Sequence, residues 1–268
     1  MLSYQHAYHA GNAADLHKHI ALGELLARLT VKARGLTYVE THAGRGLYDL
    51  RSAEAAKTGE AARGIGRLAP DDATPYGEAL NAVRARHGPS SYPGSPMIAR
   101  LLLRPQDRLV LHELHPAEHA GLVRAMAGSG PPVAIHRRDG FEGSLALAPP
   151  DPRRGLVLVD PSYEVKAEYP AAATFVRRLL ARWPEAVVLV WYPLLAAGRH
   201  TELVAGLRGL RARRDEVAIA GARTGMTGSG LLLVNAPHGA ERALAAARAQ
   251  SGGILLPLAG GHPGPGRT

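Results

Sequence analysis

The sequence predicts an α/β fold with a doubly wound sheet, and two observations carry this prediction. The run Leu156–Val159 is apolar at every position, so both of its faces are buried, as in a central strand of a parallel sheet. Gly44 and Gly46 follow the first predicted strand, residues 36–41, and a glycine pair at such a turn lets the backbone approach a ligand closely. Asp160 and Glu113 stand at the ends of predicted strands, where open α/β sheets bind their ligands.

The first predicted helix follows residues 1–12, which show neither helix nor strand periodicity. Asn12 is the predicted N-cap, with Asp15 three residues later. Leucine and isoleucine residues would face inward as far as about Lys32, and Gly35 would end the helix. Further strands are predicted at 36–41, 109–113, 133–136, 187–191, 216–220 and 231–235, and further helices at 97–104, 171–183 and up to about 210.

The stretch 50–92 is polar, alanine-rich and helix-prone. It puts many more residues between the first two predicted strands than one connecting helix needs. We therefore interpret it as a small helical insertion within a single domain of residues 1–268. Ser95 and Pro96 then suit the N-cap and first position of the next helix. The Gly/Pro-rich tail 260–268 is predicted to be disordered.

Composition restricts the partners. The net charge of +9 and the isoelectric point of about 10.2 favour a polyanion, and nucleic acid is the first candidate. The chain has no cysteine, which excludes disulfides and thiolate metal sites. No signal-peptide pattern and no membrane-spanning apolar stretch is visible, so we expect a cytoplasmic protein.

Histidines are concentrated near the N-terminus, at His6, His9, His17 and His19. Their spacing does not match a familiar zinc site, and no second cluster of ligands follows. We therefore expect no metal, and interpret these side chains as lining a substrate or cofactor pocket.

The segment Asp160-Pro161-Ser162-Tyr163 leaves the predicted central strand, because Pro161 cannot continue the hydrogen-bond ladder. A carboxylate and a backbone carbonyl at such a turn can hold the two hydrogens of an exocyclic amine, and an aromatic ring can stack on a flipped base. The segment resembles the Asp-Pro-Pro-Tyr loop of methyltransferases that act on the adenine N6 amine. A solvated acid in an ordinary turn is the alternative.

A wider resemblance rests on motifs along the whole chain. They are Leu-Ser-Tyr-x-His-x-x-His-Ala-Gly-Asn at 2–12, Lys-His at 18–19, Thr-His-Ala-Gly-x-Gly at 41–46, Pro-Gly-Ser-Pro at 93–96, Glu-Leu-His-Pro at 113–116, Asp-Gly-Phe at 139–141 and Asp-Pro-x-Tyr at 160–163. In this order they resemble the RlmJ family, the bacterial 23S ribosomal RNA adenine N6-methyltransferases. The resemblance implies a class I S-adenosylmethionine-dependent methyltransferase fold, that cofactor as methyl donor, and 23S ribosomal RNA as partner of a monomeric enzyme.

The resemblance also implies roles for individual residues. The catalytic group comprises Asp160, Pro161 and Tyr163. Contacts with RNA fall on Tyr4 and His6. Cofactor contacts fall on Lys18, His19, His42, Gly44, Gly46, Ser95, Glu113, Asp139, Gly140 and Asp160. Two of these assignments leave an alternative open: Glu113 as a surface acid beside its neighbouring histidines, and Asp139 as the cap of the next helix.

Two positions depart from the family pattern. Ser162 replaces the second proline of the loop, and Glu40 stands where the first strand of the family usually offers aspartate. Two other functions remain open at this point: methylation of another acceptor, such as a DNA adenine or a protein amide, and RNA binding by a protein that has lost catalysis.

Overall fold

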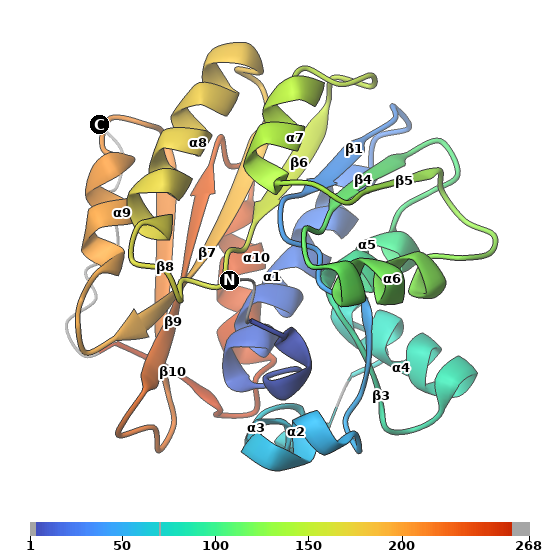
Figure 1. Cartoon of the computed structure of the whole chain (residues 1–268), viewed down its shortest axis with the longest axis vertical. Coiled ribbons are helices and arrows are strands. Elements are labelled where there is room, and N and C mark those ends of the chain that lie inside the picture. The colour runs from blue at the N-terminus through green and yellow to red at the C-terminus, as the bar shows by residue number, and fades with distance from the viewer. Residues whose placement is uncertain (1–3, 70, 259–268) are drawn as a thin grey trace.

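An eight-stranded mixed sheet forms the centre of the molecule (Figure 1). The computed structural model describes residues 4–69 and 71–258. Across the sheet the strands follow the order β10-β8-β9-β7-β6-β1-β4-β5. Their bounds are β1 (Thr37–Glu40), β4 (Arg108–His112), β5 (Val133–His136), β6 (Gly155–Val159), β7 (Val187–Leu195), β8 (Ala212–Ile219), β9 (Met226–Val234) and β10 (Leu255–Pro257).

The strands from β5 to β7 are parallel, whereas β9 runs antiparallel to both β7 and β8. The chain moves from β1 to β4 and β5 on one side, then returns to place β6 on the other side of β1. The strand order therefore reverses between β1 and β6, the kind of switch point where doubly wound sheets bind ligands. The predicted doubly wound α/β fold is confirmed.

Helices cover both faces of the sheet, and alternate strand residues supply the two cores. Leu156 and Leu158 pack on the first face, and Val157 and Val159 on the second, as the period of a pleated strand requires. The first face carries α1 (Ala13–Thr30), α4 (Pro75–His87), α5 (Ser95–Leu102), α6 (Pro116–Ala125) and α10 (Ala240–Ala249); the second carries α7 (Gly140–Leu147), α8 (Glu168–Arg182) and α9 (His200–Gly206).

The stretch between β1 and α5 contains helices, as predicted for 50–92, but a small sheet closes it. Strands β2 (Leu47–Asp49) and β3 (Ser91–Pro93) pair antiparallel, and the buried Tyr48 and Tyr92 lie opposite one another in the register. Between them lie α2 (Ala53–Thr58), α3 (Glu60–Arg63), the 3₁₀ turn η2 (Ile65–Arg67) and α4. The division into one domain with an inserted subdomain stays a prediction.

Several helix boundaries differ from the predicted ones: α8 begins at Glu168 rather than 171, and α9 ends at Gly206 rather than near 210. Two other differences lie close to the site. Asn12 caps α1 as predicted, accepting a hydrogen bond from the Asp15 N–H, but the helix ends at Thr30, so Gly35 is not its terminator. The N-cap of α5 is Gly94, and Ser95 is the first helical residue. The Ser95 hydroxyl instead donates to Glu40, which removes it from capping.

β8 and β9 begin several residues before the predicted 216–220 and 231–235 and end one residue earlier, and β9 takes in much of the glycine-rich link. Glycine is needed in that strand because a Cβ at Gly230 would lie 2.2 Å from the Tyr192 ring. The predicted tail 260–268 lies outside the described residues. No helix within the described ranges is long and apolar enough to cross a lipid bilayer.

Candidate active site at the carboxyl ends of the strands

A cavity of about 590 Å³ opens at the carboxyl ends of β1, β4, β5 and β6, beside the start of α1. We call it the strand-end cavity. It brings together residues from all seven motifs that were singled out in the sequence. The predicted site residues that line it are Tyr4, His6, Lys18, His19, His42, Gly44, Ser95, Glu113, Asp139, Gly140, Asp160, Pro161 and Tyr163.

Gly46 is the one predicted site residue that does not line the cavity. It has a φ of +75°, and its Cα faces Leu122 and Met126 at the end of α6. Its carbonyl accepts a hydrogen bond from the Gly94 N–H. Gly46 therefore supports the turn on the side away from the cavity, whereas Gly44 faces the cavity.

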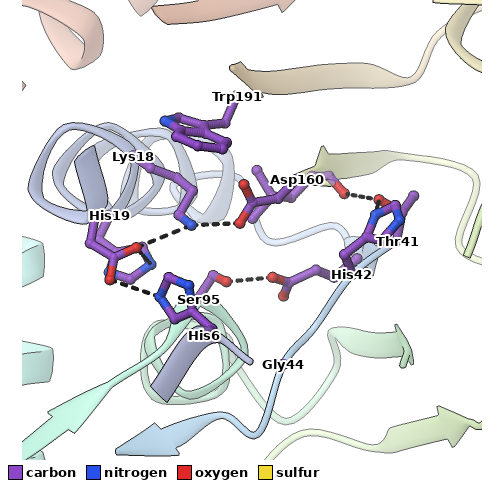
Figure 2. A network of polar contacts seen from close by, with 12 residues as sticks. His6, Lys18, His19, Thr41, His42, Gly44, Ser95, Asp160 and Trp191 are labelled. Atoms are coloured by element: carbon purple, nitrogen blue, oxygen red, sulfur yellow. Dashed lines mark hydrogen bonds and ion pairs between the residues drawn. The ribbon is translucent and has the colours of Figure 1, made fainter. Parts of the chain in front are cut away.

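Asp160 follows the last residue of β6 and forms an ion pair with Lys18. The Lys18 Nζ lies 2.5 Å from Asp160 Oδ2 and 3.2 Å from Asp15 Oδ1 (Figure 2). It also lies 5.5 Å from the centre of the Trp191 ring. Burial alone would lower the pKa of Lys18, but Asp160 and Asp15 raise it above its ordinary value. A charged lysine thus balances two carboxylates in a nearly closed space.

Asp15 joins this ion pair to the N-terminal segment. Its Oδ2 accepts hydrogen bonds from the Gly11 N–H and from His6 Nε2, both at 2.9 Å. Because His6 Nε2 donates to Asp15, its Nδ1 is free to accept from the Tyr4 hydroxyl, also at 2.9 Å. Burial would raise the pKa of Asp15, yet the charge of Lys18 and the hydrogen bond from His6 hold it well below its usual range.

His19 belongs to the same cluster but remains neutral. Burial lowers its pKa to about 3, and Lys18 and His6 add to this effect against the attraction of Asp15. Its Nδ1 lies 2.9 Å from the Tyr92 hydroxyl. His19 therefore offers a neutral imidazole at the wall of the cavity.

Gly44 and Glu113 connect the turn after β1 to the end of β4. The Gly44 N–H donates to Glu113 Oε2 at 2.8 Å, and the His115 N–H donates to Oε1 at 2.7 Å. Burial raises the pKa of Glu113. Gly44 has a φ of +61°, and a Cβ there would lie 2.4 Å from the Tyr48 hydroxyl oxygen. This position therefore requires glycine, and Glu113 is held toward the cavity rather than on the open surface.

Asp139 caps α7, since its Oδ1 accepts from the Glu142 N–H at 2.9 Å. The cap uses one carboxylate oxygen, so the capping interpretation is confirmed without excluding a contact with a ligand. Gly140 packs against the end of β1, where a Cβ would lie 1.8 Å from the Thr41 carbonyl oxygen. His42 stands beside this contact, and burial lowers its pKa to about 4.

Glu40, the residue that departs from the family pattern, is fully buried behind the cavity. Its carboxylate accepts from the Tyr38 hydroxyl at 2.9 Å and from the Ser95 hydroxyl. Burial raises its pKa to about 8, although both hydrogen bonds oppose this shift. Glu40 thus holds Ser95 at the cavity wall.

Comparisons with known proteins give one family. The family model described as "Ribosomal RNA large subunit methyltransferase D, RlmJ" matches residues 33–258. A protein of Escherichia coli (strain K12) named "Ribosomal RNA large subunit methyltransferase J" is 37% identical over 272 residues, covering 98% of this chain and 97% of its own length. A protein of the same name from Haemophilus influenzae is 37% identical over 250 residues and covers 88% of each.

The chain belongs to the RlmJ family. A crystal structure of a Legionella pneumophila protein superimposes with a TM-score of 0.81 at 33% identity, covering 92% of this chain and 96% of the other. The family and the class I methyltransferase fold predicted from the sequence are therefore confirmed.

The Asp-Pro-Ser-Tyr loop of this RlmJ family member is held by its neighbours. Tyr163 has a φ of +57°, which is uncommon for a residue other than glycine. Its hydroxyl donates to the Trp191 carbonyl at 2.8 Å, and its ring packs against Tyr169. Ser162, in place of the family proline, donates to Glu168 at 3.3 Å. The loop therefore has a side-chain hydrogen bond at the position where the family has its second proline ring.

Trp191 and Asp15 are site residues that the sequence did not reveal as such. The Trp191 indole donates to Ser229 Oγ at 2.9 Å, and this hydroxyl lies 2.9 Å from His17 Nδ1. His17 Nε2 lies 3.0 Å from Asp215 Oδ2. Since indole only donates, this chain runs in one direction and fixes the ring beside Lys18. Trp191 lies in the middle of β7, next to β6; its place at the end of the predicted strand 187–191 was the available signal.

A metal site is not visible in the part of the chain that the structure describes: no group of three or more His, Asp or Glu side chains is placed to hold an ion. The histidines near the N-terminus instead make hydrogen bonds to acids and hydroxyls. Metal-independent function stays a prediction.

Proposed function

We propose that this protein transfers a methyl group from S-adenosylmethionine to the N6 amine of one adenine in 23S ribosomal RNA. The observation that carries the proposal is the position of Asp160. It stands at the end of β6 beside the switch point of the sheet, within the strand-end cavity and in contact with Lys18. The names of the curated relatives support ribosomal RNA of the large subunit as the substrate.

The donor set of the cavity fits S-adenosylmethionine. Glu113, at the end of β4, would hold the ribose hydroxyls, and Asp139, after β5, the adenine amine. Gly44 provides a backbone without a side chain on the cavity wall. The remaining contacts would come from Lys18, His19, His42, Ser95 and Gly140. When bound, the cofactor supplies a methyl group on a positively charged sulfur.

The chain's own residues then orient the acceptor. The Asp160 carboxylate and the Pro161 carbonyl accept hydrogen bonds from the two hydrogens of the adenine amine, which favours a pyramidal and more nucleophilic nitrogen. Asp160 stabilises the positive charge that develops on this nitrogen and accepts its proton. The ion pair with Lys18 holds Asp160 in place. Positioning and electrostatics supply most of the rate enhancement in such a site.

Aromatic and polar groups at the cavity mouth hold the base. Tyr163 is assigned to stack on the adenine, because its hydrogen bond to the Trp191 carbonyl fixes the ring. Tyr4 and His6 are assigned to the RNA, since they line the same cavity and are linked to Asp160 through Asp15 and Lys18. We further propose that the protein acts as a monomer, without metal, in the cytoplasm where ribosomes are assembled.

Mass mapping of methylated adenines in ribosomal RNA tests the proposal. Cells that lack the gene should lose one N6-methyladenine in 23S ribosomal RNA. The wild-type gene should restore it, and a gene encoding Asp160→Ala should not. An unchanged set of methylated adenines in the deletion strain would contradict the proposed substrate.

A further inference from the structure

A second cavity, of about 560 Å³, lies between α4, α5 and α6. Figure 1 shows these helices close together on the right of the view. Four arginines line this cavity, Arg45, Arg86, Arg100 and Arg124, and no aspartate or glutamate does. We call it the arginine groove.

Within residues 4–69 and 71–258, no acid pairs with three of the four arginines. Arg45 pairs with Glu118, but Arg100 donates only to the carbonyls of Gly128 and Ser129, both at 2.7 Å. Arg86 and Arg124 are exposed, and their guanidinium groups have no ion pair or hydrogen bond within the described residues. The groove therefore presents positive charge that no acid in the described part of the chain compensates.

The groove shares a wall with the strand-end cavity. Gly44 and Tyr48 line the strand-end cavity, whereas Arg45 and Leu47 line the arginine groove. Neighbouring residues of α5 divide in the same way, with Ser95 on one side and Met97 on the other. A polymer with one monomer in the strand-end cavity can thus extend across this wall into the arginine groove.

The lining also contains apolar side chains. Met97 and Leu101 lie among the arginines, and Leu101 is 42% exposed. Arginine guanidinium groups bind phosphate oxygens in a forked geometry, and apolar surface suits the flat faces of bases and sugars. This combination fits a nucleic acid strand better than an inorganic anion.

We propose that the arginine groove binds the RNA backbone next to the target adenine, with Arg86, Arg100 and Arg124 contacting phosphates. The inference rests on the proposed function for its choice of RNA. It adds a second binding site, outside the methyl-transfer cavity, that holds the strand while the adenine is presented to Asp160.

The test compares two double variants of the full chain. Arg86→Ala with Arg124→Ala removes two groove cations. Arg178→Ala with Arg242→Ala is the matched control, because these exposed arginines lie on α8 and α10 and have no side-chain partner within the described residues. RNA affinity is measured by fluorescence anisotropy with a large-subunit ribosomal RNA fragment, at salt concentrations that span a fourfold range.

The groove variant should bind the RNA about tenfold or more weakly at low salt. Each phosphate contact adds about 0.7–0.9 to the magnitude of the slope of log affinity against log salt concentration. Because the variant lacks two contacts, the factor by which its affinity falls across the fourfold salt range should be roughly tenfold smaller than for the parent. Affinity for S-adenosylmethionine, and the single-turnover rate at saturating RNA, should match the parent. The control should change RNA affinity by less than threefold.

Equal weakening in the two variants would overturn the proposal, because it would assign the effect to net charge. Unchanged RNA affinity in the groove variant would overturn it as well. Loss of binding to polyglutamate, with RNA affinity intact, would reassign the groove to an acidic protein. The affinities for RNA and for polyglutamate are measured without catalysis, so failure of the proposed methyl transfer would be seen separately in the wild-type protein.

Discussion

The strand-end cavity and the arginine groove are similar in volume, at about 590 and 560 Å³, and share a wall, but their charges are arranged in opposite ways. In the strand-end cavity, Lys18 is paired with two carboxylates, and Glu113 accepts two backbone N–H groups. In the groove, Arg86 and Arg124 have no partner among the described residues.

This difference indicates that the two cavities have different roles, one in catalysis and one in binding. Groups that hold one another in place before a ligand arrives are suited to stabilising a transition state, because little reorganisation remains to be done. Cations left without partners are suited to a polyanion, which displaces counterions when it binds. The following predictions test whether the two regions separate in this way.

The largest expected effect is that of Asp160→Ala, which should slow methyl transfer by roughly 100- to 1000-fold, the scale for one preorganised partner of a transition state. Asp160→Asn should keep more activity, since an amide oxygen still accepts a hydrogen bond. Both variants should fold, because Lys18 retains Asp15 at 3.2 Å. Single-turnover rates at saturating cofactor separate chemistry from binding. Near-parental rates for Asp160→Ala would place the chemistry elsewhere.

Lys18→Met should destabilise the protein by about 3 kcal/mol, because it leaves two buried carboxylates without their cation. Lys18→Arg is the control that keeps the charge and should lose less. Denaturant unfolding of both variants gives the free energies. If Lys18→Met unfolded like the parent, the ion pair would not organise the strand-end cavity.

Tyr4→Ala should weaken methylation of RNA by about 1–3 kcal/mol, the scale for stacking of one base on an aromatic ring. Affinity for S-adenosylmethionine should stay close to that of the parent. Tyr4→Phe keeps the ring and loses only the hydrogen bond to His6, so it should retain most of the activity. An equal loss of cofactor affinity in Tyr4→Ala would place Tyr4 at the cofactor instead.

Acid should destabilise the fold through three histidines whose pKa burial lowers, His19, His42 and His112. Burial lowers the pKa of His19 to about 3 and of His42 and His112 to about 4. Below pH 6.5 the unfolded chain therefore binds protons that the folded chain does not, and stability falls as the pH falls.

Glu40 opposes this trend. Its pKa of about 8 means that the folded state keeps a proton that the unfolded state loses above pH 4.5. With three histidines against one acid, the net loss from pH 7 to 5.5 should be about 2 kcal/mol. Glu40→Gln removes the opposing contribution and should make the fall steeper. Urea unfolding at both pH values measures it, and stability that rises on acidification would contradict the assignment.

The sequence predicted the parts of the site that depend on local patterns. An unalternating apolar run followed by proline was enough to place Asp160 at a strand end, and acids at later strand ends located Glu113 and Asp139. Alternating burial and chain-breaking residues determine such features, and both are visible in one sequence.

Contacts between distant segments could not be predicted in this way. Lys18 and Asp160 are 142 positions apart, and their ion pair depends on how α1 crosses the sheet. Ser95 was interpreted as a cap because the sequence does not show that Glu40 lies within reach of its hydroxyl. Gly46 was assigned to the cofactor because a Gly-x-Gly pattern does not tell which glycine faces the cavity.

The central claim is that the strand-end cavity binds S-adenosylmethionine and that this binding needs no metal. Calorimetric titration of the full chain with S-adenosylmethionine, in the presence of a chelator, measures this. We expect one cofactor molecule per chain with an affinity that the chelator does not change, and weaker binding to Glu113→Ala. Loss of binding on chelation, or an unchanged affinity in Glu113→Ala, would contradict the account.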